Sequence, residues 1–350
     1  MRVGGDMGGR RIRALCCSAH QTPLLHALGL SLTVRLYIGD VRSELRRIAS
    51  NSVHCAVTSP PYFGLRDYGC AGQIGLEPTP DDYVAEMVAV FREVQRVLRP
   101  DGTLWLNLGD SYAGGGCGAR DPERWPKQSR SAGTTMPFHS KKQTGLKNKD
   151  RLMIPARVAL ALQADGWYLR DEIIWHKPNP MPVSVTDRTT PAHEMLYMLS
   201  KSARYYYDME QIREPLSEST LKRWKGVPTR TGPNGTDTVA RSTPTGKETT
   251  CGANPAGRQP RSVWSIPTRP FKGAHFATFP PDLIRPCILA GCPKGGTVLD
   301  PFFGAGTTGV VANELGRNAV GVELNQEYAA IALERILAAQ GANRRLQVAA

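Results

Sequence analysis

Long apolar runs are missing from this sequence, and so are the cysteine patterns that bind metals. No stretch of about 18 apolar residues occurs in the 350 residues, so no membrane-spanning helix is expected. The eight cysteines form no C-x-x-C pair and no Cys/His cluster at zinc spacing, which predicts reduced thiols and no bound metal. Polar residues interrupt the apolar segment after the basic start, which argues against a secretory signal peptide. These features predict a cytoplasmic protein.

Acidic residues are scarce relative to basic ones: 31 Asp and Glu stand against 44 Lys and Arg, a net charge of +13. The excess falls in two segments rich in Gly, Pro, Ser and Thr. Residues 113–150 hold 8 basic and 3 acidic residues, a net of +5, and residues 211–272 hold 11 and 4, a net of +7. Positive charge concentrated on loop-like segments is typical of proteins that bind a polyanion, but solvated loops have the same composition.

The rest of the chain alternates strand and helix patterns. Strands are predicted at 32–38, 53–58, 103–108, 168–175, 297–299 and 319–322, with one more within 196–207. Helices are predicted at 43–48, 79–98, 155–164, 282–290, 307–315 and 326–339. This alternation predicts an α/β fold with a doubly wound, mostly parallel sheet. Residues 1–31 are expected to be a poorly ordered extension, and residues 341–350 a tail.

A glycine-rich turn follows the strand predicted at 297–299. Gly304 and Gly306 let the backbone turn sharply and approach a ligand, and they open a helix. Glu323, at the end of the next strand, can accept hydrogen bonds from both hydroxyls of a ribose. The spacing from Gly304 to Gly309 also fits a dinucleotide fingerprint. Asp300 before the turn suits an ammonium group and would repel a pyrophosphate, which favours S-adenosylmethionine over a nicotinamide cofactor.

The sharpest motif is Ser59-Pro60-Pro61-Tyr62, directly after the strand at 53–58. It falls at the carboxyl edge of the predicted sheet, where such folds bind ligands. The prolines hold the loop extended and offer no N–H, so it presents two acceptors, the Ser59 oxygen and the Pro60 carbonyl. Acceptors that grip the hydrogens of an exocyclic base amine would favour its attack on a methyl group. Tyr62 would stack on the base, which must first be flipped out of a duplex.

Together the two loops resemble the amino-methyltransferases that modify DNA at cytosine N4 or adenine N6. In that family the catalytic loop reads S/N/D-P-P-Y/F, which Ser59–Tyr62 matches, and Asp300–Thr307 matches the cofactor motif. The catalytic loop precedes the cofactor motif, as in the family's β class. S-adenosylmethionine is therefore the expected cofactor. The residues expected to bind it are Asp40, Thr58, His275, Phe276, Phe279, Asp300, Phe302, Gly304, Gly306, Thr307, Thr308 and Glu323.

The resemblance also implies duplex DNA as the substrate and association with the nucleoid. It places sequence reading in an insertion at 211–260, assisted by 113–150, between a catalytic half (32–210) and a cofactor half (261–340) of one domain. The segment 175–180 resembles the wall of the target pocket. The residues expected to contact DNA are Trp175, Lys177, Pro178, Lys222, Arg223, Arg258 and Arg261. A restriction enzyme acting on the same sequence would accompany such a protein in a restriction–modification system. Monomer and homodimer both remain open.

Serine before Pro-Pro-Tyr goes mostly with cytosine N4 in that family, and adenine N6 is the alternative. Methylation at cytosine C5 would need a nucleophile such as Cys287, but this residue falls in an apolar helix pattern typical of a buried thiol. A related loop that begins with Asn methylates protein glutamines, and Ser59 argues against that reaction. A nicotinamide dehydrogenase would leave the Ser59–Tyr62 loop unexplained. A catalytically silent DNA-binding module is the alternative from another class, although both motifs match in full.

Overall fold

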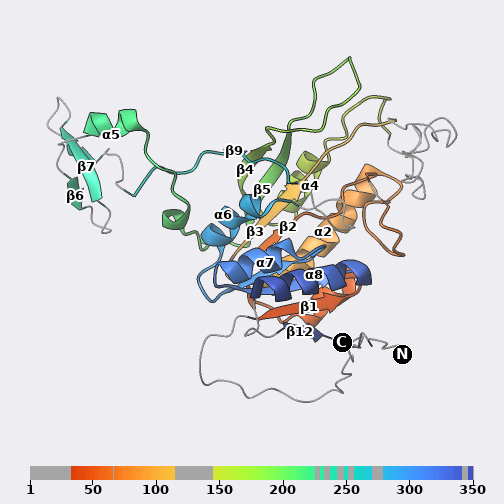
Figure 1. Cartoon of the computed structure of the whole chain (residues 1–350). Coiled ribbons are helices and arrows are strands. Elements are labelled where there is room, and N and C mark those ends of the chain that lie inside the picture. Colours follow the sequence, from red (N-terminus) through yellow and green to blue (C-terminus); the bar gives the residue numbers. More distant parts are fainter. Residues whose placement is uncertain are drawn as a thin grey trace, which may run out of the picture.

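Nine strands form the central sheet of the computed structural model, in the order β12-β1-β11-β10-β2-β3-β5-β4-β9 (Figure 1). The structure describes residues 33–65, 67–114, 145–224, 229–231, 237–242, 248–250, 256–269, 279–340 and 346–349. The strands of the sheet are β1 (Val34–Ile38), β2 (Val53–Thr58), β3 (Leu98–Leu108), β4 (Tyr168–His176), β5 (His193–Ser200), β9 (Val263–Ser265), β10 (Thr297–Asp300), β11 (Asn318–Glu323) and β12 (Leu346–Ala349).

The sheet is mostly parallel, as the sequence predicted. Every neighbouring pair from β12 to β3 runs parallel, β5 runs antiparallel to β3 and β4, and β9 runs parallel to β4. The carboxyl ends of β1, β2, β3, β4, β10 and β11 therefore share one edge with the amino end of β5. In a sheet of this kind ligands bind outside the carboxyl ends of the strands. This edge carries the two loops that the sequence singled out.

Helices cover both faces of the sheet (Figure 1). They are α1 (Val41–Glu44), α2 (Pro80–Val97) and α4 (Ile154–Ala164) on one side, and α6 (Pro281–Gly291), α7 (Thr307–Glu314) and α8 (Gln326–Gln340) on the other. Along β3, Leu104 and Leu106 join the buried cluster of α2, whereas Trp105 between them joins that of α6. Side chains of a strand alternate between faces, so a strand covered on both sides is apolar throughout.

The helix α2 begins where the sequence predicted. Thr79 accepts a hydrogen bond from the Asp82 amide at 3.1 Å, and Pro80 occupies the first turn. The helix ends at Val97, next to its predicted end at residue 98. The strand predicted at 103–108 begins earlier, at Leu98, because Leu98 is fully buried and pairs with Val53 of β2. The strand sought within 196–207 is β5, which ends at Ser200.

Part of the basic insertion at 211–260 has regular structure, which its loop-like composition did not indicate. It contains α5 (Glu218–Trp224), β6 (Thr229–Thr231), β7 (Asp237–Ser242) and β8 (Glu248–Thr250), and η2 (Met209–Ile212) overlaps its start. The three strands form a separate antiparallel sheet, which with α5 projects from the main body (Figure 1).

The segment predicted as a C-terminal tail includes β12, which pairs with β1. The predicted N-terminal extension and most of the basic segment 113–150 lie outside the described residues. In the part that is described, no helix has the length and apolar character needed to cross a membrane.

Candidate active site

A pocket opens at the carboxyl edge of the sheet, between the loop after β2 and the turn after β10. Its lining comes from the ends of four neighbouring strands and from α7 and α8. The predicted site residues among its lining are Asp40, Ser59, Pro61, Phe279, Asp300, Phe302, Gly304, Thr307 and Glu323. Most of the predicted cofactor residues that the structure describes therefore meet in one cavity, which is continuous with the predicted catalytic loop.

Asp300 is the most buried charged group of this pocket, with 1% of its surface exposed. Its two oxygens accept hydrogen bonds from the Thr58 and Thr308 hydroxyls, each at 2.7 Å, and from the Phe302 amide at 3.1 Å. Burial raises the pKa of Asp300 to about 7, against the lowering effect of these hydrogen bonds. Thr58 and Thr308 thus contact Asp300, which lines the pocket, and these hydrogen bonds connect the catalytic loop to the cofactor turn.

Glu323 is the second buried carboxylate, and it lies at the end of β11. It accepts hydrogen bonds from the Gly304 amide at 2.7 Å and the Asn325 amide at 2.8 Å. Burial raises the pKa of Glu323 above its ordinary value. Each carboxylate oxygen has a second lone pair, so Glu323 can still accept hydrogen bonds from a ligand.

The turn between β10 and α7 depends on glycine. Gly304 and Gly306 have φ values of 51° and 75°, in the left-handed region that favours glycine. A Cβ atom at Gly306 would lie 2.8 Å from the Cβ of Ala332 on α8, so this turn can approach α8 only without a side chain. The helix α7 starts directly after this turn, and its first residue, Thr307, lines the pocket.

Asp40 follows β1 and caps α1 by accepting a hydrogen bond from the Arg42 amide at 2.8 Å. The side-chain hydrogen bond from Arg42 holds the pKa of Asp40 below its ordinary value. Arg42 also donates to the Gly72 carbonyl at 2.9 Å and to Glu86 at 3.1 Å. These bonds fix Asp40 at the rim of the pocket.

One wall of the pocket was not predicted from the sequence. Tyr68, Gln73 and Ile74, from the segment before α2, and Tyr328 of α8 all line it. The rings of Tyr68 and Tyr328 meet edge to face with their centroids 6.3 Å apart. Segment 68–74 shows no strand or helix periodicity, so only the fold brings it to the pocket.

The catalytic loop presents an ordered row of hydroxyl groups. The Ser59 hydroxyl donates to the Tyr62 oxygen at 3.3 Å, and the Tyr62 hydroxyl donates to Glu194 at 2.8 Å. The Asn107 side-chain oxygen also lies 3.1 Å from the Tyr62 oxygen. Burial raises the pKa of Tyr62 well above its ordinary value, and the charge of Glu194 adds to this shift. Tyr62 therefore stays a neutral hydroxyl that links Ser59 to a carboxylate.

The ring of Tyr62 packs against backbone that only glycine allows. A Cβ atom at Gly109, just after β3, would lie 2.8 Å from the Cδ2 atom of this ring and closer still to Cε2. Such distances are below van der Waals contact, so a side chain at Gly109 would displace Tyr62. The predicted stacking of a base on Tyr62 would have to use the part of the ring that Gly109 leaves uncovered.

Glu194 and Asn107 were also not predicted from the sequence. Asn107 is 2% exposed and donates to Glu194 at 3.3 Å and to the Met195 carbonyl at 3.2 Å. Lys177 forms an ion pair with the other oxygen of Glu194. These residues come from β3, β5 and the end of β4. A single polar residue within each apolar strand was the only sign of these groups in the sequence. The face of the sheet on which such a side chain lies depends on the strand register.

The predicted target wall is partly core. Trp175 is 4% exposed, and its indole N–H donates to the Ile266 carbonyl at 2.8 Å. The Lys177 ammonium lies 4.4 Å from the centroid of the Trp175 ring, and Pro178 is exposed at the start of the next loop. The contact of Trp175 with a base stays a prediction.

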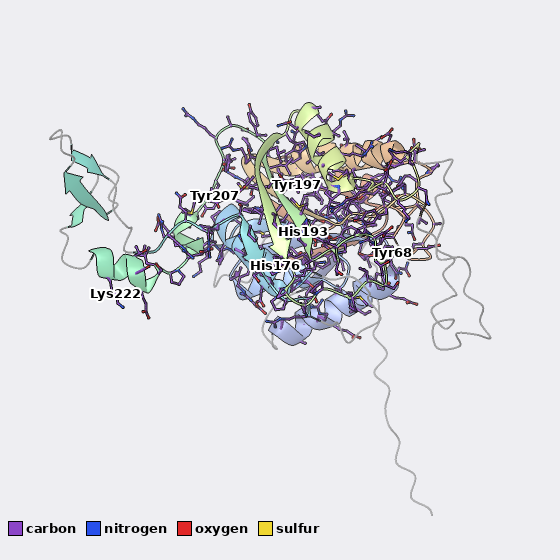
Figure 2. All side chains as sticks on the ribbon, turned by 90° about the horizontal axis from the view of Figure 1, so that it is seen from above. Tyr68, His176, His193, Tyr197, Tyr207 and Lys222 are labelled. Atoms are coloured by element: carbon purple, nitrogen blue, oxygen red, sulfur yellow. The ribbon has the colours of Figure 1, made fainter. Side chains whose placement is uncertain are left out.

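The other residues predicted to contact DNA lie farther from the pocket. Arg258 and Arg261 both form ion pairs with Glu214, at 2.8 Å and 3.4 Å. Lys222 is exposed on α5, in the projecting unit, well away from the body that carries His176 and His193 (Figure 2). The Arg223 side chain, His275 and Phe276 lie outside the described residues. The residues predicted to contact DNA therefore lie on two separate surfaces, one beside the pocket and one away from it.

Cys287 is a buried structural thiol, as its helix pattern predicted. It is fully buried in α6 and donates to the Leu283 carbonyl at 3.4 Å. Burial raises the pKa of this thiol well above its ordinary value. A fully buried thiol with a raised pKa is no nucleophile for C5 methylation.

The family model for a DNA methylase matches residues 53–334, more than half of the chain. The chain belongs to this DNA methylase family. Both the catalytic loop after β2 and the cofactor turn after β10 fall inside the matched range. The family predicted from the two motifs is therefore confirmed.

Two curated relatives of this DNA methylase are similar over most of their length. The type II methyltransferase M.SmaI of Serratia marcescens is 46% identical over 303 residues, which cover 87% of this chain and 90% of the relative. M.Cfr9I of Citrobacter freundii is 46% identical over 301 residues, which cover 86% and 87%.

Solved structures share the fold of this DNA methylase. TTHA0409 of Thermus thermophilus, described as a DNA modification methylase and complexed with S-adenosyl-L-methionine, is 25% identical with a TM-score of 0.54, and the match covers 90% of this chain and 99% of that one. The cytosine-N4-specific PvuII DNA methyltransferase has a TM-score of 0.56 at 18% identity, with 91% and 92% covered. The predicted fold class and the predicted cofactor, S-adenosylmethionine, are confirmed.

Proposed function

We propose that this DNA methylase transfers a methyl group from S-adenosylmethionine to the N4 amine of a cytosine flipped out of duplex DNA. The observation that carries the proposal is the neutral Ser59 hydroxyl at the edge of the pocket, oriented by Tyr62. Its hydrogen is directed at Tyr62, so its lone pairs are free to accept from an amine. Methylation of adenine N6 remains the alternative, and it would use the same residues.

The pocket has the donors and acceptors that S-adenosylmethionine requires. Asp300 would hold the ammonium group, and Glu323 the ribose hydroxyls. Asp40 would contact the adenine, beside the wall formed by Tyr68 and Tyr328. When bound, the cofactor supplies a methyl group activated by its sulfonium. A cation beside Asp300 would favour the ionised form of a carboxyl group whose burial now disfavours it.

The Ser59 oxygen and the Pro60 carbonyl would accept the two hydrogens of the cytosine amine. The lone pair of this amine is delocalised into the ring, and hydrogen bonds to both hydrogens favour a tetrahedral nitrogen that can attack. These acceptors are fixed before the substrate arrives, because two prolines restrict the loop and Tyr62 holds the serine hydroxyl. Ser59 and Pro60 are therefore catalytic residues that act by alignment and electrostatics.

The row of hydroxyls also gives the surplus proton a way out. Formation of the N–CH3 bond leaves the amine one proton in excess. That proton would pass to the Ser59 oxygen, the Ser59 hydrogen to Tyr62, and the Tyr62 hydrogen to Glu194. Each hydroxyl gives up one proton as it receives another, so only Glu194 changes its charge. Its carboxylate, paired with Lys177, is partly exposed and can release the proton to water.

The projecting unit at 211–260 is proposed to read the DNA sequence, with the basic segment 113–150 assisting. Its distance from the pocket suits contacts to base pairs beside the flipped nucleotide. Lys222 is exposed there and has no ion pair with any other residue that the structure describes, which suits a phosphate contact. Since its curated relatives are type II methyltransferases, we propose that a restriction enzyme acts on the same sequence. Whether the methylase acts as a monomer or a homodimer would follow from sedimentation on DNA.

The test is to incubate the protein with S-adenosylmethionine and mixed-sequence duplex DNA, digest the DNA to nucleosides, and identify the product by mass spectrometry. N4-methylcytosine is expected. N6-methyladenine would overturn the choice of base and keep the mechanism. C5-methylcytosine would contradict both. The matched control is the same DNA incubated without the cofactor.

A further inference from the structure

The loop between β4 and β5, residues 177–192, starts and ends at the active site. His176 and His193 pair across the two strands, and they lie close together in Figure 2. The residues next to them along the chain, Lys177 and Glu194, form the ion pair beside Tyr62. Both ends of this long loop therefore lie beside Tyr62 of the catalytic loop.

Both arms of this loop are held to neighbouring segments. On the first arm, Asn179 donates to the Thr268 carbonyl at 3.1 Å and accepts from the Thr268 amide at 2.9 Å. On the second arm, Asp187 forms an ion pair with Lys149 at 2.5 Å. The neighbouring Arg188 guanidinium lies 4.1 Å from the centroid of the Tyr112 ring. These contacts fix the arms and leave the tip between them.

The tip is apolar and exposed. Met181 has 87% of its surface exposed, and Val183 and Val185 have 38% and 42%. Pro180 and Pro182 alternate with these side chains and restrict the backbone. A stiff, anchored loop that keeps three apolar side chains in water is suited to a partner that covers them.

We propose that this tip is a wedge that enters the DNA base stack and fills the gap left by the flipped nucleotide. The inference rests on the proposed methylation of a flipped base. A base that reaches Ser59 leaves a gap in the base stack beside the loop that starts and ends at the pocket, and apolar side chains often insert between base steps. A second copy of the chain is a poorer fit, because a stable interface buries about 800 Å² on each side and three side chains on one loop offer far less.

The test compares two duplexes that contain the sequence in which the wild-type protein methylates a base. One duplex is fully paired, and the other has a mismatch opposite the target, which lowers the energy needed to flip it. The variant is the double substitution Met181→Ser with Val183→Ser. Leu160→Ser, at a 61% exposed position on α4, is the matched control. Single-turnover methyl transfer and cofactor affinity are measured for each protein.

On the paired duplex the double variant should transfer methyl groups at least about tenfold more slowly than wild type. On the mismatched duplex it should come within about twofold, with cofactor affinity unchanged on both. An equal loss on both duplexes, or no loss on either, would overturn the wedge. A change in oligomeric state in the variant would point instead to an interface between copies and would also overturn it. If wild type methylates no base, the proposed function fails, and this outcome is separate because it precedes any variant.

Discussion

Replacing Asp300 by Asn separates the stability of the fold from the binding of the cofactor. An Asn oxygen can still accept from Thr58 and from the Phe302 amide, and its NH2 group can donate to Thr308. The substitution therefore keeps the hydrogen bonds around this position and removes its charge. A carboxyl group whose pKa is raised from 3.8 to about 7 destabilises the fold by about 4 kcal/mol at a pH above both values. At pH 8 we expect the free energy of unfolding of the variant to equal that of wild type or to exceed it by up to about 4 kcal/mol.

The direction of the pH dependence follows from the protonation state of Asp300 that the fold disfavours, which is the ionised one. The folded pKa of Asp300 lies above the unfolded value, so the protonated group favours folding. Its contribution to stability is complete at acid pH and declines as the pH rises from about 4 to about 7. Urea unfolding of wild type should show this decline, and Asp300→Asn should lack it. Asp282→Asn, at a partly exposed position on α6, is the matched control.

Cofactor binding should change in the opposite direction. If the carboxylate of Asp300 holds the ammonium group, cofactor binding requires the ionised form. With a pKa of about 7, Asp300 is ionised in roughly a tenth of the protein molecules at pH 6. Calorimetry should then show wild-type affinity weakening by about tenfold between pH 8 and pH 6. The Asn variant should bind weakly at both pH values. Wild-type-like affinity in Asp300→Asn at pH 8 would refute this reasoning.

Three further substitutions test the catalytic loop. Tyr62→Phe keeps the ring and removes the link between Ser59 and Glu194, so single-turnover transfer should fall by about 100-fold, whereas a rate within twofold of wild type would refute the proton route. Glu194→Gln should lower the single-turnover rate, because the amide cannot take a proton from Tyr62, with Glu172→Gln as the unaffected control; an unchanged rate would argue that another group takes the proton. Gly109→Ala should displace Tyr62 and cost about 1–3 kcal/mol in urea unfolding as well as activity, and normal values of both would show that the ring can shift freely.

The parts of the site that follow a strand end could be predicted from the sequence. Ser59 directly follows an apolar strand, and Asp300 ends another, so both had to lie at the carboxyl edge of a parallel sheet. Their partnership through Thr58 could not be predicted, because it requires β2 and β10 to be neighbours, and these strands are far apart in the chain. Local patterns locate strand ends, whereas the order of strands in the sheet depends on tertiary packing.

The polar groups behind the catalytic loop, Asn107 and Glu194, could not be predicted from the sequence for the same reason. Glu194 meets Tyr62 because β5 runs antiparallel to β3, in a register that sets Leu196 opposite Asn107. A shift of one residue would turn Glu194 to the other face of the sheet. The projecting sheet of β6, β7 and β8 was missed because its strands are short and rich in Thr and Arg, so they lack the apolar alternation that marks a half-buried strand.

If Ser59 aligns the amine that receives the methyl group, Ser59→Ala should slow the transfer step. The decisive quantity is the single-turnover rate of methyl transfer to duplex DNA, measured beside the cofactor affinity of the same protein. We expect a rate lower by about 100-fold to 1,000-fold, as for the loss of one preorganised group, with cofactor affinity nearly unchanged. A rate close to that of wild type, at normal cofactor affinity, would contradict this role of Ser59.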